Sequence, residues 1–282
     1  MTHFLKYIFL IILFAAGTDV VACRGVKKSA APAPETEFTV VIDPGHGGKD
    51  SGCVGKSAKE KDINLRVATL LREMINDDKD KIKVILTRKD DRYLTLQQRA
   101  DVANRNKGDL FISIHVNSID YKTPGRETVS GASVYTVGVD KEQSTLNVAM
   151  RENAVIELEE DFTTRYSGFD PSSAESYIIF ELSNNLHQRQ SVNLATAIQQ
   201  ELVTTAGRDD KGVRQAGFWV LWATSMPSVL VELDFICNPE CEKFLASDDG
   251  CRKCAQALYN AFKTYHGSYM AKRQHTAEQA RR

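Results

Sequence analysis

The sequence has little net charge, no internal repeat and no apolar run long enough to cross a bilayer. Its 282 residues carry a formal net charge of -1, whereas a nucleic-acid-binding surface is usually basic. Charge therefore gives no indication of a nucleic-acid partner. What the chain does have is an ordinary globular composition, 42% hydrophobic and 26% charged. Its length suits one large α/β domain or two small ones.

The N-terminus is typical of an exported protein. Lys6 precedes an apolar run from Tyr7 to Ala16, which is too short for a transmembrane helix and suits the core of a signal peptide. The small residues before Cys23 resemble a bacterial lipoprotein cleavage site, so residues 1–23 are predicted to be the signal. We expect a periplasmic protein whose membrane contact is a lipid on Cys23. The plainer alternative is a simple cleaved signal in which Cys23 is incidental.

The remaining chain is predicted to be a linker (24–37), one catalytic domain (38–266) and a disordered basic tail (267–282). Strands alternate with helices throughout the domain. This order predicts a single three-layer α/β domain, in which helices cover both faces of a mixed, mostly parallel sheet of about six strands. The expected strands lie near 40–42, 83–87, 110–116, 131–137, 218–221 and 228–233.

Three of these strands end in residues suited to chemistry. The first runs into a glycine-rich turn that carries His46, another carries His115, and the last carries Glu232. The carboxyl ends of strands in an open α/β sheet form the usual ligand crevice. Strand alternation also places Ser113, His115 and Asn117 on one face, which is polar, unlike an ordinary core face.

Two histidines and one carboxylate would make a zinc site with a position left for water. Glu60 is the candidate carboxylate, because it lies across the glycine-rich loop from His46 at the expected start of a helix. Ser57 and Glu60 also match a capping box, in which Glu60 would only bond a backbone N–H. Taken alone, these residues favour the capping role.

Glu232 is the candidate general base. It ends an apolar run, and a poorly solvated carboxylate has a raised pKa. Such a group can accept a proton from zinc-bound water and return it to a leaving amine. The alternative is a carboxylate at a strand end that simply faces solvent.

These features together resemble the zinc-dependent N-acetylmuramoyl-L-alanine amidases, cell-wall hydrolases that include the bacterial division amidases. The resemblance implies one Zn²⁺ on His46, Glu60 and His115, with Glu232 as the catalytic carboxylate. It implies hydrolysis of the amide between N-acetylmuramic acid and L-alanine in peptidoglycan, during wall remodelling or daughter-cell separation. The matching segments are 42–48, 59–65, 87–88, 96–104, 113–117 and 226–238.

The resemblance also places a variable helical segment at about residues 146–185. In some members this segment covers the active site until a protein activator displaces it. Acidic residues here could occupy the open zinc position, and Glu159, Glu160 and Glu175 are our candidates for this self-inhibition, beside Glu157 and Asp161. The alternative is a solvated acidic helix face.

The spacing of four C-terminal cysteines raises the question of a second metal site or a disulfide. The spacings Cys237-x3-Cys241 and Cys251-x2-Cys254 would suit a second zinc site, but the resembling family needs no metal there. An oxidising compartment would allow a disulfide, for which Cys241–Cys251 is our hypothesis.

The functional alternatives are a zinc peptidase acting within stem peptides and an inactive wall-binding module. The four filled chemical positions argue against the second.

Overall fold

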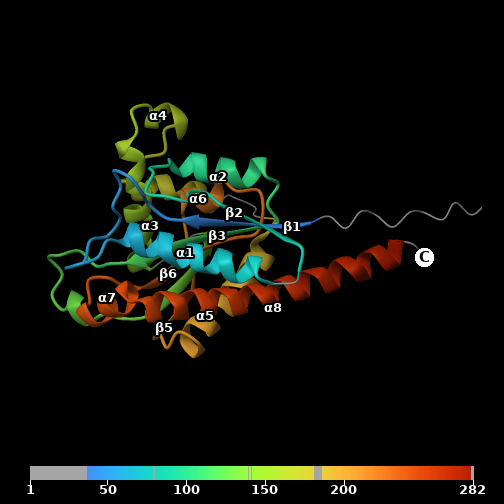
Figure 1. Cartoon of the computed structure of the whole chain (residues 1–282). Helices are drawn as coiled ribbons and strands as arrows, with labels where there is room; N and C mark the ends of the chain where they lie inside the picture. Colours follow the sequence, from blue (N-terminus) through green and yellow to red (C-terminus); the bar gives the residue numbers. More distant parts are fainter. Residues whose placement is uncertain (1–36, 79, 139, 141, 181–185, 281–282) are drawn as a thin grey trace, which may run out of the picture. The chain divides into compact units, whose positions relative to one another are not determined.

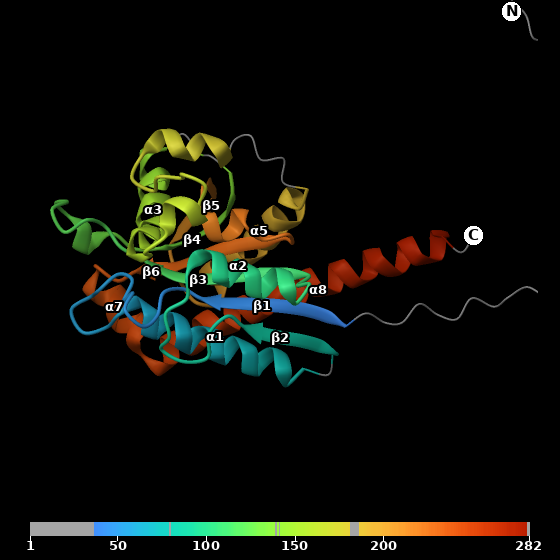
Figure 2. The ribbon, with the colours of Figure 1, turned by 90° about the horizontal axis from the view of Figure 1, so that it is seen from above.

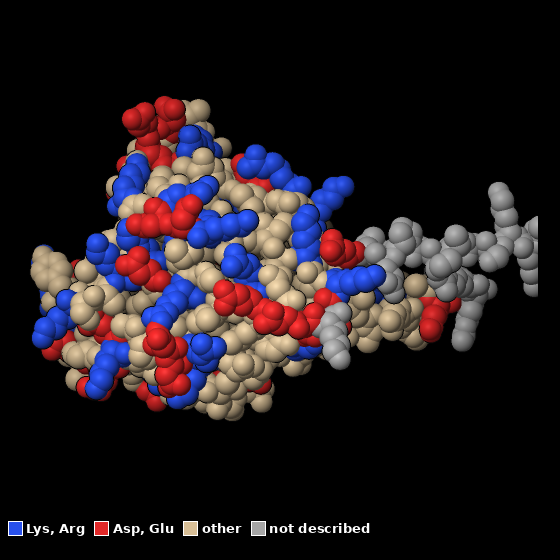
Figure 3. Space-filling model, in the orientation of Figure 1, with Lys and Arg blue, Asp and Glu red and all other residues tan. Residues whose placement is uncertain are grey.

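The computed structural model describes residues 37–280 except 79, 139, 141 and 181–185. The expected signal peptide, Cys23 and all but the last residue of the expected linker lie outside the described residues. Within the part described, no helix is both long and apolar enough to span a membrane. On the face shown in Figure 3, basic and acidic side chains are interspersed.

A six-stranded sheet runs through the centre of the domain in the order β2-β1-β3-β6-β4-β5 (Figure 1). β4 pairs antiparallel with β6, and the other pairings are parallel. The prediction of a mixed, mostly parallel sheet is therefore confirmed. The strands are β1 (Phe38–Pro44), β2 (Ile82–Leu86), β3 (Leu110–Asn117), β4 (Ala132–Val137), β5 (Asp210–Ala216) and β6 (Ser228–Phe235).

Helices cover both faces of this sheet. Adjacent residues of β1 show the division, because Val40 and Ile42 pack on one side and Val41 on the other, as strand alternation requires. The first side is covered by α1, α5 and α8, and the second by α2, α3 and α6. The helices are α1 (Glu60–Asn76), α2 (Leu96–Arg105), α3 (Gln143–Asn153), α4 (Phe162–Arg165), α5 (Gln188–Thr204), α6 (Trp219–Trp222), α7 (Pro239–Ala246) and α8 (Asp248–Ala280).

Two predicted elements differ from the structure. Residues 218–221, expected as a strand, lie largely in α6, whereas β5 was not expected. A short apolar run such as Trp219–Trp222 does not distinguish a buried helix turn from a strand. β5 is an edge strand with a polar sequence and mostly incomplete burial, so it lacks the apolar alternation that marks a strand.

The chain after Gly267 also differs from the prediction. Instead of a disordered tail over 267–282, α8 continues to Ala280, and its last turns extend beyond the rest of the domain (Figure 2). This stretch is rich in Ala, Lys, Arg, Gln and Glu, which are strong helix formers. Local propensity is consistent with a helix that continues past its last packed turns.

Candidate metal centre and active site

Three adjacent strands bring the predicted site residues to one edge of the sheet. His46 follows β1 directly, His115 lies near the end of β3, and Glu232 lies on β6. His115 and Glu232 are partners in the β3–β6 register. The structure therefore places the two histidines and Glu232 together, as their positions at strand ends suggested.

Two buried arginines hold the turn that carries His46. The His46 backbone is left-handed, with φ of 59°, which is uncommon for a residue other than glycine. Arg99 Nη2 donates to the His46 carbonyl and Arg88 Nη2 to the Gly45 carbonyl, each at 2.8 Å. Asp43 in turn accepts from Arg99 Nη1 at 2.9 Å. These bonds stabilise a backbone conformation that directs the imidazole to the sheet edge.

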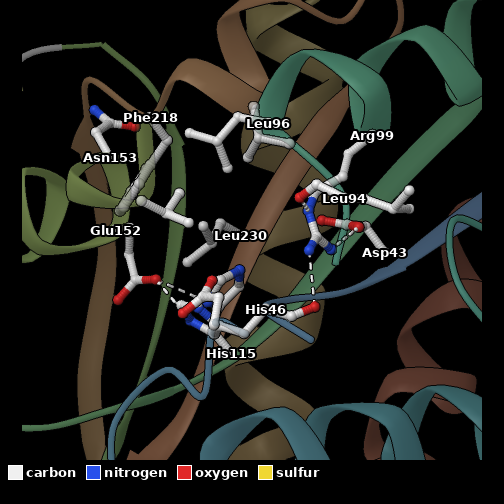
Figure 4. A pocket seen from close by; sticks show the side chains of 13 residues that line it. Asp43, His46, Leu94, Leu96, Arg99, His115, Glu152, Asn153, Phe218 and Leu230 are labelled. Atoms are coloured by element: carbon white, nitrogen blue, oxygen red, sulfur yellow. Dashed lines mark hydrogen bonds and ion pairs between the residues drawn. The ribbon is translucent and has the colours of Figure 1, made fainter. Parts of the chain in front are cut away.

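Four buried side chains converge on one point: His46, Glu60, His115 and Glu152. His46 Nε2 lies 3.0 Å from Glu60 Oε1 and 3.1 Å from Glu152 Oε2. His115 Nδ1 lies 3.1 Å and 3.0 Å from the same two oxygens. In Figure 4, Glu152 reaches toward the two imidazoles from above the sheet edge. All four ligand atoms lie within 4.8 Å of one another, so the cluster could hold a metal ion.

The donor set fits a tetrahedral cation. Zinc bonds of about 2.0–2.2 Å to His and carboxylate ligands would separate neighbouring ligand atoms by about 3.3 Å. The four separations between an imidazole nitrogen and a carboxylate oxygen, 3.0–3.1 Å, are close to this value, and all the ligand atoms lie within 4.8 Å of one another. His46 Nε2 is buried and faces the Glu60 and Glu152 oxygens, while Nδ1 lies 2.7 Å from Asp50 Oδ2. A carboxylate that bonds the other ring nitrogen in this way orients an imidazole that binds a metal.

The electrostatics of the cluster also favour a positive charge. Burial alone would lower the pKa of His115, but Glu152 and Glu60 outweigh it and raise the pKa to about 9. Burial likewise opposes the charge on His46, but Glu60, Asp50 and Glu152 raise its pKa well above the ordinary value. Two buried carboxylates therefore require positive charge between them, either protons on the imidazoles or a metal cation.

Glu60 does not cap α1. The N-cap residue is Lys59, without a side-chain cap. The Glu60 carboxylate instead accepts from Val116 N at 2.9 Å and from Cys53 N at 2.7 Å. The capping box with Ser57 is thus not formed, and the carboxylate is turned into the site.

Glu232 is fully buried beside the cluster. Burial, followed by the charge of Glu152, raises the pKa of its carboxyl to about 8. Arg151 Nη2 lies 3.3 Å from Glu232 Oε1, and Oε2 has no hydrogen-bond partner among the described residues. The alternative of a solvent-facing carboxylate is therefore wrong.

Glu152, at the C-terminal end of α3, was not predicted. It is Glu152, not Glu159, Glu160 or Glu175, that the structure places beside the histidines. Glu159 accepts from Tyr166 Oη at 2.7 Å and from Arg165 Nη1 at 2.6 Å, whereas Glu160 and Glu175 are exposed. Helical spacing could have indicated Glu152 from the sequence. This residue shares the buried stripe of α3 with Thr145, Val148 and Ala149.

The described cysteines take no part in this cluster. Cys53, Cys237, Cys241, Cys251 and Cys254 are free thiols. The hypothesised Cys241–Cys251 disulfide is therefore not formed. Within the described part of the chain, the metal-binding cluster contains no cysteine.

Comparison with known proteins identifies the family. Residues 40–264 match the family model of N-acetylmuramoyl-L-alanine amidase. The chain belongs to this amidase family. It is 30% identical over 245 residues to N-acetylmuramoyl-L-alanine amidase AmiA of Escherichia coli K12, covering 86% of this chain and 81% of AmiA. It is also 32% identical over 250 residues to the uncharacterized protein YqiI of Bacillus subtilis, covering 87% and 95% of the two chains.

A solved structure agrees with this assignment. N-acetylmuramoyl-L-alanine amidase from Clostridium difficile 630 superposes with a TM-score of 0.61 at 26% identity, covering 82% of this chain and 98% of that one. The chain is thus a peptidoglycan amidase, an enzyme of cell-wall remodelling.

Proposed function

We propose that His46, Glu60 and His115 hold one catalytic zinc ion and that Glu232 is the general base. The reaction is hydrolysis of the amide that joins N-acetylmuramic acid to L-alanine in peptidoglycan. The observation that carries this proposal is the convergence of three buried donors beside Glu232. The same four residues match the amidase motifs of the sequence.

The chain's own residues supply proton transfer and orientation. Zinc would act as a Lewis acid for the amide carbonyl and lower the pKa of its water to about 7. Glu232 accepts a proton from the attacking water and delivers it to the leaving amine of L-alanine. Its burial and raised pKa suit this role, since a base with a pKa near the working pH can both take and return a proton. Asp50 holds the His46 ring in its ligating orientation.

The Glu232→Gln variant tests the assignment. We expect turnover to fall by about 10²- to 10⁴-fold, the usual contribution of a general base, while the zinc content stays at one per chain. Activity is read by dye release from purified sacculi, and mass analysis of the products should show free stem peptides that begin at L-alanine. The exposed Glu240→Gln variant is the control.

Two results would contradict the assignment. Substantial activity in Glu232→Gln would mean that another residue is the base. Products cut within the stem peptide would indicate the alternative zinc peptidase.

We further propose that α3 holds the enzyme in a self-inhibited state. Glu152 Oε2 fills the fourth position around the cluster, and the adjacent Arg151 pairs with Glu232. The end of α3 therefore covers the metal site and the base at once. The cavity beside His46, His115 and Glu152 is about 10 Å³, room for about one water molecule at most. A peptidoglycan strand needs α3 to move away.

A protein activator would drive this movement. Contacts outside the cluster also hold the segment closed. Among them, Lys49 Nζ donates to the Leu158 carbonyl at 2.8 Å, Arg151 Nη1 to the Ser118 carbonyl at 2.7 Å, and Asn153 Nδ2 to the Gly217 carbonyl at 2.7 Å. A partner that binds the displaced segment better than the closed one would shift the equilibrium toward the active state. Unchanged basal activity after removal of the Glu152 carboxylate would count against self-inhibition.

We also propose export to the periplasm, with a lipid on Cys23. The apolar run before Cys23 and the cell-wall substrate support this location. Membrane fractionation of a Cys23→Ala variant tests the lipid. The variant should leave the membrane fraction, and an unchanged distribution would remove the lipid from the account.

A further inference from the structure

The loop of residues 47–59 joins two of the proposed ligands, His46 and Glu60, and its backbone lies directly against both. Cys53 N donates to Glu60 Oε2 at 2.7 Å. A Cβ atom on Gly52 would lie 2.6 Å from Glu60 Oε2 and 2.6 Å from His46 Cδ2, closer than such atoms can approach. The position of this loop therefore decides where the Glu60 carboxylate points.

Glu242 on α7 holds the far part of the same loop. Its Oε1 accepts from Ser57 N at 2.5 Å, from Ala58 N at 2.9 Å and from Ser57 Oγ at 3.0 Å. A Cβ on Gly55 would lie 2.5 Å from that oxygen, so the loop backbone wraps closely around the carboxylate. The residue is buried, and although burial opposes ionisation, the backbone N–H groups lower its pKa.

α7 is itself fixed to the strands that carry the other site residues. Ile236 N, just before the helix, donates to the Asn117 carbonyl of β3 at 2.9 Å. Asn238 caps α7 by accepting from Glu240 N at 2.9 Å and donates to the Val129 carbonyl at 3.1 Å. Because α7 follows β6, Glu242 connects the ligand-bearing loop to the strand of Glu232.

We propose that Glu242 is a positioning residue of the metal centre, which holds the 47–59 loop so that Glu60 meets the two histidines at the edge of the sheet. Glu242 touches neither the substrate nor the reacting atoms and acts through the loop backbone. The inference rests on the proposed role of Glu60 as a zinc ligand. It predicts that the reach of the side chain matters more than its charge.

Zinc affinity of the full-length chain is the direct test, measured by competition with a chromophoric chelator. Glu242→Ala and Glu242→Asp should each bind zinc about tenfold more weakly, which is within the range found when a residue that supports a metal ligand is lost. Asp is shorter by one C–C bond of about 1.5 Å, so it keeps the charge but loses the contact. Glu242→Gln keeps an acceptor oxygen at the same reach and should bind zinc nearly as the unchanged chain does. Glu240→Ala, exposed on the same helix, is the matched control.

The outcomes separate this inference from the proposed function. If Glu242→Ala does not fold, the comparison of Glu242→Asp with Glu242→Gln still tests the inference. Far-UV circular dichroism checks that both variants are folded. Equal zinc affinity in Glu242→Asp and Glu240→Ala would overturn the inference. So would weakened zinc binding in Glu242→Gln together with unchanged binding in Glu242→Asp. Glu60→Ala is measured alongside: if it retains zinc, the ligand assignment itself fails. If Glu60→Ala loses zinc while Glu242→Asp keeps it, only the role of Glu242 is refuted.

Discussion

Glu60 and Glu152 bring carboxylate oxygens equally close to the same two imidazoles, but the protein holds them in different ways. Both Glu60 oxygens accept backbone N–H groups, one from the sheet and one from the glycine-rich loop. Glu152 Oε2 faces the two imidazoles and accepts no backbone N–H among the described residues, and Oε1 is 3.0 Å from Nε of the adjacent Arg151. Apart from the cluster, the fold contributes little to fixing the second carboxylate.

Under the proposed assignment, this difference distinguishes Glu60, a permanent metal ligand, from Glu152, a ligand that leaves when the site opens. Withdrawing Glu60 would leave Val116 N and Cys53 N without their acceptor, and an unpaired buried N–H costs about 1–3 kcal/mol. Withdrawing Glu152 would leave no backbone N–H of the described residues without its acceptor, because none donates to this carboxylate. The part of the site built on β1, α1, β3 and β6 belongs to the core of the fold, whereas α3 contributes the part that the proposed self-inhibition requires to move.

Substituting Glu60 should have the largest effect. We expect Glu60→Ala to lose zinc and to lower activity by about a hundredfold or more, since even outer-shell partners contribute 10- to 100-fold. Zinc content after dialysis and dye release from sacculi measure the two effects. Retention of stoichiometric zinc would show that Glu60 is no more essential than Glu152, and the distinction between them would fail.

Substituting Glu152 should act in the opposite direction. Glu152→Ala is expected to raise basal activity about tenfold, as if a closed state favoured by about 1.4 kcal/mol had been removed, with zinc still bound. Glu157→Ala, exposed a few residues further along, provides the control in the same dye-release assay. A fall in activity would instead make Glu152 a permanent part of the working site.

Releasing the anchor beside Glu152 should give a smaller rise. Asn153 Nδ2 donates to the Gly217 carbonyl, and its Oδ1 accepts from Trp219 N at 3.0 Å. Asn153→Ala leaves both partners unpaired, which should lower the free energy of unfolding by about 1–3 kcal/mol and loosen the end of α3. Denaturant melts and basal activity together test this. A destabilised chain with unchanged basal activity would mean that Asn153 supports the fold without holding the segment closed.

The fixed part of the site was predictable from the sequence because it depends on strand ends. An apolar strand that runs into a polar turn indicates His46, whereas His115 and Glu232 are polar residues that follow apolar runs within β3 and β6. Glu60 needed the family resemblance, because a glutamate at a helix start looks like a cap until its partners in space are known.

The removable part was not predictable to the residue. The middle segment offers many acidic side chains, and the choice among them depends on how α3 packs against the sheet. The helical stripe that includes Val148 and Glu152 could have indicated Glu152, because it places an acidic residue on the buried face of α3. β5 was missed for a related reason, since an exposed edge strand such as Asp210–Ala216 carries little hydrophobic pattern.

Anomalous diffraction at the zinc absorption edge, from crystals of the unchanged chain, would show whether a zinc ion lies among the four side chains. We expect one peak about 2.0–2.2 Å from His46 Nε2, from His115 Nδ1 and from carboxylate oxygens of Glu60 and Glu152. Crystals of Glu152→Ala should keep the peak with three protein ligands. The absence of a peak among these side chains, or a zinc peak at another place in the protein, would contradict the proposed metal site.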